Sequence, residues 1–183
     1  MSATRMLVLG IIRWAGAAHG YQVRSELHGW GAQEWARMNP GSIYHAIRKA
    51  AADGLLVEVP EDGRDAGPDR MRYAVTDAGV AELRELVRSG LRTTRDPYML
   101  NAALAMLPML ERADAVAMLD ARLVELDEAI ALLESFGDRP PNESPEHVVE
   151  QVRLWLAQVR TDKEWTTGLR ERLLNGAYRM ADN

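Results

Sequence analysis

The sequence predicts a mainly α-helical protein, with an N-terminal winged helix-turn-helix that carries a two-stranded wing and a C-terminal α-helical dimerisation domain. Residues 1–92 follow the order helix, helix, helix, strand, strand, helix, which is that of a winged helix-turn-helix. Within this half, residues 39–49 form a proline-started helix with polar and cationic side chains outside one apolar stripe. Residues 93–183 contain two long helices whose apolar residues step by four and three. The chain is therefore divided into two domains, 1–92 and 93–183.

The composition is that of a globular protein and excludes several kinds of site. The chain has 183 residues, of which 47% are hydrophobic and 27% charged. It has no cysteine, which excludes disulfides and thiolate metal sites and fits a reducing compartment, so we expect a cytoplasmic protein. No apolar run approaches the ~20 residues of a transmembrane helix. The net charge of −5 is divided unevenly, +1 over residues 1–92 and −6 over residues 93–183, so the first half is free to present a basic face.

Two helices precede the proline-started helix. Apolar residues at helical spacing predict the first at residues 4–14, and the second is expected at residues 19–29, where glycines end it. We expect residues 34–38 to form a loop or a short turn. These two helices would support the third, as in a helix-turn-helix.

The third helix has a marked start and two different surfaces. Asn39 is expected to accept a hydrogen bond from a free backbone N–H, and Pro40 occupies the first helical position. Ile43, Ala46 and Ile47 form the stripe expected to be buried. The outer surface carries hydroxyl, imidazole and cationic groups, on Ser42, Tyr44, His45, Arg48 and Lys49. Such a surface suits a phosphate backbone and base edges, and the alternative is an ordinary surface helix.

A hairpin and a fourth helix complete the first half. Residues 55–59 and 71–75 have strand character, and the glycines, prolines and charges between them predict a turn. Thr76 is expected to cap the fourth helix. The apolar stripe of that helix is expected to comprise Val80, Leu83, Val87 and Leu91.

Four short motifs of the first half resemble, in order and spacing, the signature of the PadR-type transcriptional regulators. They are His19-Gly20-Tyr21, Pro40-Gly41-Ser42-Ile43-Tyr44, Asp53-Gly54-Leu55 and Tyr73-Ala74-Val75-Thr76-Asp77-Ala78-Gly79. The resemblance implies a dimeric winged-helix repressor that binds an operator with two-fold symmetry. It also implies that the C-terminal helices form the dimer.

The resemblance also implies which residues contact DNA. The candidates are Tyr21, Ser42, Tyr44, Arg48, Lys49, Arg70 and Arg72, to which His45 is added as a possible donor to a base or a phosphate. Two departures from the family are apparent. After Lys49 come three alanines, where the family usually has leucine and then a larger acidic residue. The wing tip carries four acidic residues, which phosphates would repel: Glu61, Asp62, Asp65 and Asp69.

The second half is expected to form an apolar helix followed by a long helical hairpin. Residues 99–107 are almost wholly apolar, and residues 111–136 and 144–178 form the two long helices. Their apolar seams comprise Leu119, Leu123, Leu126, Ile130 and Leu133 on one helix and Val148, Val152, Trp155 and Val159 on the other. A hairpin of this length needs a partner surface, for which a second copy is the better candidate. The alternative is a seam that is satisfied entirely within one chain.

No residue pattern predicts a catalytic, metal or cofactor site, so the protein is not expected to be an enzyme. An apolar cavity for a small hydrophobic or aromatic effector is one candidate site. Its walls would come from Trp14, Met99, Met106 and Trp155, with Met109 and Trp165 as further candidates. The alternative is that these residues belong to the core.

The function that the sequence favours is a homodimeric repressor that binds a double-stranded DNA operator through its third helix. A small effector would release it by favouring a dimer spacing that does not fit the operator. One alternative is a winged-helix protein-interaction module that does not bind DNA, which the net acidity favours. Another is a small-molecule-binding dimer without a DNA role.

Overall fold

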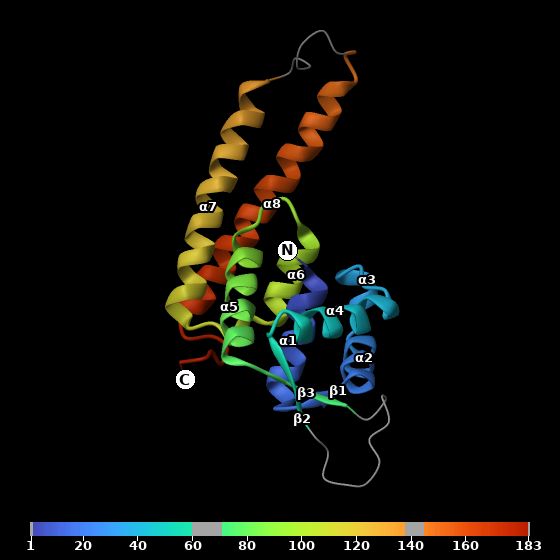
Figure 1. The fold of residues 1–183 in the computed structure, drawn as a ribbon. Helices are drawn as coiled ribbons and strands as arrows, with labels where there is room; N and C mark the ends of the chain where they lie inside the picture. The colour runs from blue at the N-terminus through green and yellow to red at the C-terminus, as the bar shows by residue number, and fades with distance from the viewer. Residues whose placement is uncertain (1, 60–70, 138–144, 183) are drawn as a thin grey trace. The chain divides into compact units, whose positions relative to one another are not determined.

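A computed structural model describes residues 2–59, 71–137 and 145–182 of the chain (Figure 1). Its elements in order are α1 (Ala3–Ala15), β1 (Ala18–His19), α2 (Gly20–Gly29), α3 (Ala32–Trp35), α4 (Pro40–Ala52), β2 (Leu56–Val59), β3 (Arg72–Val75), α5 (Asp77–Arg92), α6 (Pro97–Ala105), η2 (Leu107–Met109), α7 (Arg112–Ser135) and α8 (Val148–Leu174). They form two compact units, residues 1–111 with 180–183 and residues 112–179. The first unit thus includes α6, which the sequence-based division assigned to the second domain.

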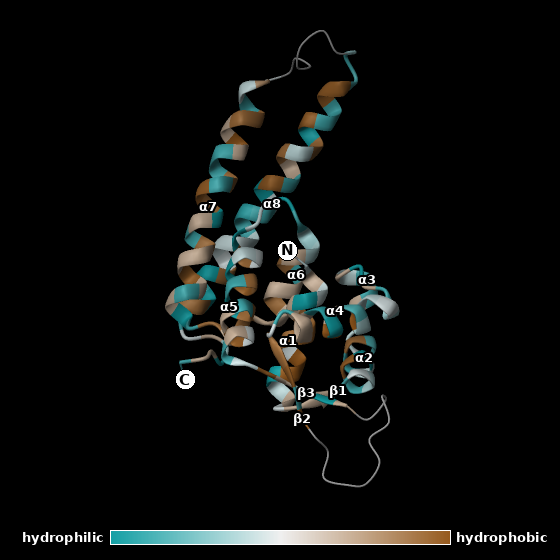
Figure 2. Cartoon of the chain, in the orientation of Figure 1, coloured by the Kyte–Doolittle hydropathy of each residue, from teal (hydrophilic) through white to brown (hydrophobic). Residues whose placement is uncertain are grey.

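Helix α1 is the centre of the first unit. It packs against α2, α4, α5, α6 and β3. It is apolar on almost every side over its middle, as Figure 2 shows, and its buried residues are Met6, Leu7, Val8, Leu9, Gly10, Ile11 and Ile12. A helix that is apolar all round is stable only when other elements cover it. The order of helices and strands confirms the mainly α fold with a winged helix-turn-helix.

The sheet of the first unit has three strands in the order β1-β3-β2, all antiparallel. The sequence predicted only the hairpin formed by β2 and β3. The additional strand, β1, has two residues and pairs Ala18 with Tyr73 and His19 with Arg72. A two-residue strand has no periodicity to reveal it, and only the approach of β3 defines it. The residues predicted to form the wing tip, Arg70 included, lie outside the described part of the chain.

The segment before α4 differs in two details from the prediction. Residues 32–35 form the short helix α3, whereas a loop or a short turn was expected at residues 34–38. Asn39 does occupy the N-cap of α4, but its side chain makes no capping hydrogen bond. Instead, the Ser42 backbone N–H and hydroxyl both donate to the Asn39 carbonyl, at 2.9 and 2.6 Å. This end of α4 is therefore closed by the backbone of residue 39.

The start of α5 is fixed by a cap and a close backbone approach. The Thr76 hydroxyl accepts a hydrogen bond from the Gly79 N–H at 3.1 Å and donates to the Gly54 carbonyl at 2.8 Å. The predicted cap is therefore confirmed. A Cβ atom at Gly79 would lie 2.1 Å from the Leu55 carbonyl oxygen, so only glycine fits there. Leu83, Val87 and Leu91 of the predicted stripe are buried, together with Leu86.

The second unit is an antiparallel hairpin of α7 and α8, in which brown and teal residues alternate along both helices (Figure 2). Its core differs from the predicted seam. Leu119 and Leu126 are buried, but Leu123, Ile130 and Leu133 are only partly buried and Trp155 is exposed. The α7 side of the core is completed by Ala115 and by Arg122, which the seam had not included.

Helix α8 is shorter than predicted at both ends. It begins at Val148, after a turn at residues 146–147, and the expected N-cap Ser144 lies outside the described residues. It ends at Leu174 and not near Tyr178, whose φ of 64° is left-handed. The Arg112 guanidinium donates to the carbonyls of Leu173 and Tyr178, which fastens this end of α8 to the start of α7. Over the described residues, no helix is long and apolar enough to cross a membrane.

Candidate nucleic-acid interface

Helix α4 separates a buried stripe from an exposed polar surface. Ile43 and Ile47 are 3% and 2% exposed and face the unit's core. Because a helix turns 100° per residue, His45 lies opposite this stripe, flanked by Arg48 and Lys49, and all three are exposed. Tyr44 lies at the edge beyond Arg48, and Ser42 lies at the edge beyond Lys49. The predicted DNA-facing residues of α4 thus fall into a centre and two edges with different surroundings.

The tyrosine edge of α4 faces α2. A Cβ atom at Gly20 would lie 3.0 Å from Cε1 of Tyr44, so the tyrosine ring rests on the first turn of α2. Tyr21, which is 57% exposed, stacks on His19 with ring centroids 5.3 Å apart. Gly20 therefore connects the His19-Gly20-Tyr21 motif with the motif that ends at Tyr44. An open groove of 660 Å³ follows this edge and is lined by Gly20, Tyr21, Tyr44, Ile47, Arg48, Met71 and Tyr73.

Arg48 lies where this groove meets a second one. The second groove, of 540 Å³, is lined by Arg48, Ala51, Ala52, Leu56, Val57, Glu58 and Tyr73. Arg48 and Tyr73 line both grooves, so the Arg48 side chain lies at the border between α4 and the sheet. Among the described residues Arg48 has no carboxylate within ion-pair distance. It is therefore an exposed cation that is available to an anionic partner.

Lys49, on the other side of His45, already has an ion-pair partner within the protein. Its ammonium forms an ion pair with Asp53 at 2.7 Å, and the Arg5 guanidinium binds the same carboxylate. The Lys49 hydrogen bond, and then that of Arg5, hold the pKa of Asp53 below its usual value. Arg5 also reaches Glu82 of α5, at 3.4 Å. Neither Arg5 nor Asp53 was a predicted site residue, because they are 48 positions apart and only folding brings them together.

Of the two arginines predicted on the returning wing strand, the structure describes only Arg72. The Arg72 guanidinium is directed back into the protein, where it donates to the Ala17 carbonyl at 3.1 Å. Arg70 lies outside the described residues. Tyr73, which begins the fourth motif but was not a predicted DNA contact, lines both grooves beside Arg48. Strand alternation was the signal that places it on the face opposite Arg72 and Ala74.

The candidate effector residues lie in different surroundings. Met99 is 6% exposed and Met106 is fully buried in the first unit, where the Met106 sulfur packs against Gly10. Trp14 is 47% exposed and lies 5.8 Å from Trp30, centroid to centroid. Trp155 is 45% exposed on α8. Across residues 2–59, 71–137 and 145–182, no cluster of three or more histidine or acidic residues is arranged to hold a metal ion.

Comparison with known proteins supports this description of the first unit. Residues 8–85, from α1 to the middle of α5, match the model of the transcriptional regulator PadR-like family. Over these residues the chain is similar to the PadR-like family of transcriptional regulators. The resemblance indicated by the four motifs is thereby confirmed, and the PadR-like match contains both grooves and all of α4.

Two solved structures of PadR are similar to this chain. Bacillus subtilis PadR in complex with operator DNA is 19% identical, with 92% of this chain and 98% of that chain covered and a TM-score of 0.39. Bacillus subtilis PadR in complex with p-coumaric acid is also 19% identical, with 93% and 98% covered and the same TM-score of 0.39. No curated protein matches the chain.

Proposed function

We propose that this PadR-like regulator is a cytoplasmic repressor that binds a two-fold symmetric DNA operator as a homodimer. The observation that carries the proposal is the exposed surface of α4. It presents the Arg48 guanidinium, which has no carboxylate partner among the described residues, between two grooves and with His45 beside it. An α-helix with such groups fits the major groove, where arginine reads guanine and other donors bind phosphate.

The tyrosines at the edge of α4 extend this surface. Tyr21 and Tyr44 are 57% and 36% exposed, with the Tyr44 ring held by Gly20. Tyrosine hydroxyls are frequent donors to phosphate oxygens, and such contacts fix the orientation of a recognition helix. Arg48 would then read base edges, while Tyr21 and Tyr44 bind the backbone on the α2 side.

Apolar side chains on the second unit support the proposed dimer. Val124 and Leu132 of α7 and Leu154 and Trp155 of α8 are 45–60% exposed within the chain. Large apolar groups mark a protein interface where they are exposed together as a patch, and a second copy would cover these four. A dimer would place two α4 helices on successive half-sites, and their binding energies would then act together.

The proposal is tested by replacing Tyr44 and Arg48 together with alanine. We expect this double variant to lose binding to duplexes selected from random DNA by the parent protein, with its oligomeric state unchanged in sedimentation. The matched control is Arg84→Ala with Tyr178→Ala, which removes an exposed arginine and an exposed tyrosine from outside α4. Parent binding should fall steeply as salt rises, because phosphate contacts release counterions.

The same assay decides against the alternative of a protein-interaction module. A module of that kind would leave all duplexes unshifted, and its parent protein would be indistinguishable from the Tyr44 and Arg48 variant. If instead the variant binds as the parent does, α4 is not the recognition helix.

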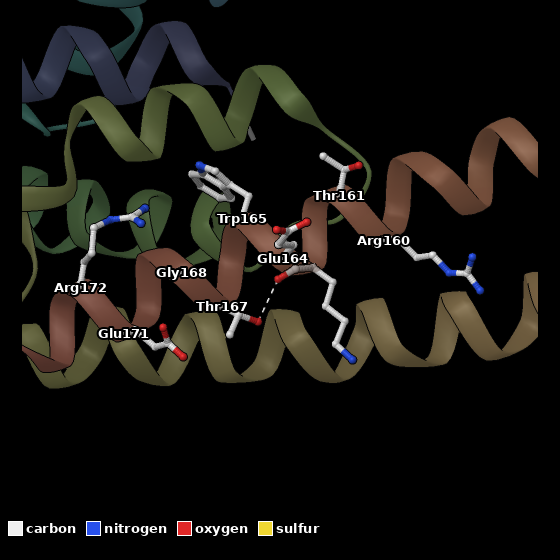
Figure 3. Close-up of a pocket in the computed structure, with 9 residues that line it drawn as sticks. Arg160, Thr161, Glu164, Trp165, Thr167, Gly168, Glu171 and Arg172 are labelled. Carbon is white, nitrogen blue, oxygen red and sulfur yellow. Dashed lines mark hydrogen bonds between the residues drawn. The ribbon is translucent and has the colours of Figure 1, made fainter.

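A small aromatic effector is the last part of the proposal. Figure 3 shows Trp165 and Arg172 on the side of α8 that faces away from α7, at an open groove of 750 Å³. The Arg172 guanidinium lies over Gly168, 3.2 Å from where a Cβ would be, beside an indole that suits a flat ring. Cinnamate or naphthoate should quench tryptophan fluorescence and release DNA from the parent protein, and a Trp165→Leu, Arg172→Gln variant should show neither effect.

A further inference from the structure

A third groove lies along the lysine edge of α4, on the side away from the tyrosines. It has a volume of 480 Å³ and lies between α4, the first turn of α1 and α5. It is lined by Ser2, Thr4, Arg5, Ser42, His45, Ala46, Lys49, Glu82 and Leu86. Three hydroxyls, an imidazole and two permanent cations therefore converge beside the exposed surface of the recognition helix.

In the free protein, both cations of this groove form ion pairs with carboxylates. Asp53 binds both Lys49 and Arg5, and Glu82 binds Arg5. The two cations and two carboxylates cancel in charge. The Lys49 side chain nevertheless stays 58% exposed, and that of Arg5 24% exposed, so an external anion can reach both.

We propose that this groove binds a backbone phosphate of duplex DNA, and that Asp53 stands in the place of that phosphate while the protein is free. The inference rests on the proposed function, because it assumes that α4 enters the major groove. A phosphodiester oxygen offers Lys49 and Arg5 the same charge-assisted hydrogen bonds that the Asp53 carboxylate offers them now. The hydroxyls of Thr4 and Ser42 supply further donors at the same wall.

The contrast with Arg48 explains what the arrangement does. Arg48 has no carboxylate partner among the described residues and is ready to bind, whereas Lys49 must exchange Asp53 for the phosphate. Asp53 therefore competes with DNA and lowers the affinity for any duplex. Because a phosphate carries no sequence information, this competition weakens non-specific and specific binding alike.

The first test is Asp53→Asn, measured by fluorescence anisotropy with a duplex selected by the parent and with an unrelated duplex. We expect both duplexes to bind about two- to fivefold more tightly, the range spanned by a surface ion pair. The matched control is Glu85→Gln on α5, which removes an exposed carboxylate paired with Arg88 at 3.7 Å but outside the groove. Unchanged or weaker binding by Asp53→Asn overturns the inference.

A second test does not require Asp53→Asn to fold. The phosphates of the selected duplex are replaced one at a time by uncharged methylphosphonates. One replacement should weaken DNA binding by the parent but not by Lys49→Gln. The slope of log affinity against log salt concentration should also be smaller in magnitude by about one for Lys49→Gln. If every replacement weakens both proteins equally, Lys49 contacts no phosphate and the groove is not a DNA site. A parent that binds no duplex at all removes the proposed function itself, which is a different result.

Discussion

Gly79 shows how a single missing Cβ positions the wing against α5. The Leu55 carbonyl oxygen would be 2.1 Å from an added Cβ, and this oxygen also accepts the Thr76 N–H at 3.0 Å. A backbone oxygen that is fixed in this way cannot give way as a flexible side chain can. The end of β3, the Thr76 cap and the link after α4 therefore meet at one glycine.

Gly79→Ala should accordingly lower the free energy of unfolding by at least about 1–3 kcal/mol, the usual cost of overpacking. Gly29→Ala is the matched control, because nothing lies within 4 Å of its added Cβ. That control should be neutral or more stable by up to about 1 kcal/mol, since alanine favours the helix. Urea titrations followed by circular dichroism would measure both, and equal effects would contradict the close approach.

Asp53 should make the stability of the protein depend on pH. Lys49 and Arg5 lower the pKa of Asp53 in the folded protein, so the unfolded chain binds its proton more readily. The stabilisation is therefore complete above about pH 4, the unfolded value, and is lost as the pH falls through the lower folded pKa. Asp53→Asn should be less stable than the parent near pH 7, and the difference should shrink below about pH 4. A difference in urea midpoint that stays constant down to acid pH would contradict this.

At the scale of elements, Arg122 is the unusual feature of the α7–α8 hairpin. It is 1% exposed, and it donates to Thr166 at 3.2 Å and to the Asp162 carboxylate. Within the described chain its Nη1 has no hydrogen-bond partner. A buried ion pair seldom adds much stability, but a buried charge without its partner is costly. The pair is therefore better suited to fixing the register of the two helices than to strengthening them.

Substitution of the two partners should therefore change the stability by different amounts. Asp162→Ala should destabilise the protein by about 1–3 kcal/mol, less than for a fully buried pair because the Asp162 side chain is 32% exposed. Arg122→Met should change the stability by less than about 1 kcal/mol, because methionine fills much of the same space. Chemical denaturation would compare them. A larger loss for Arg122→Met would show that the ion pair itself holds the hairpin together.

The elements also show where prediction from sequence succeeds. Apolar periodicity was sufficient for α1, and together with Pro40 at the start of α4 and the Thr76 cap of α5 it placed those two helices, because these signals lie within or next to each helix. β1 and α3 were missed because two and four residues carry no period, and only neighbouring elements define them. Arg122 was missed because a charged residue in a heptad pattern is normally read as solvent-exposed.

The candidate site follows the same division. The outward residues of α4 were predictable because helical geometry alone separates them from Ile43 and Ile47. Their partners were not, since Arg5 and Tyr73 reach α4 from distant parts of the chain. The sequence could therefore name Lys49 as a DNA contact, but only the fold shows that Asp53 already holds it.

For the whole molecule, the proposed function depends on how many copies of the chain act together. Operator recognition by one winged helix is limited by the few contacts that a single α4 can make. Linking two copies turns the second contact into an intramolecular event and raises the overall affinity without any new contact. The proposed dimer thus sets how strongly the α4 surface can act on DNA.

Leu132→Glu and Leu154→Glu test the proposed dimer, because both leucines are exposed on the second unit, 60% and 55%. If they lie in the interface, each buried carboxylate should cost roughly 2 kcal/mol, or about a thirtyfold weaker dimer. Trp30→Glu is the control, since it places the same charge on an exposed apolar position of the first unit, 37% exposed, that lines none of the grooves beside α4. Sedimentation velocity over a range of concentrations should show the two leucine variants dissociating while the control does not. Operator affinity should fall in parallel with dimer affinity. The proposal would be contradicted by a monomeric variant that binds the full operator as tightly as the parent, because DNA recognition would then not need the dimer.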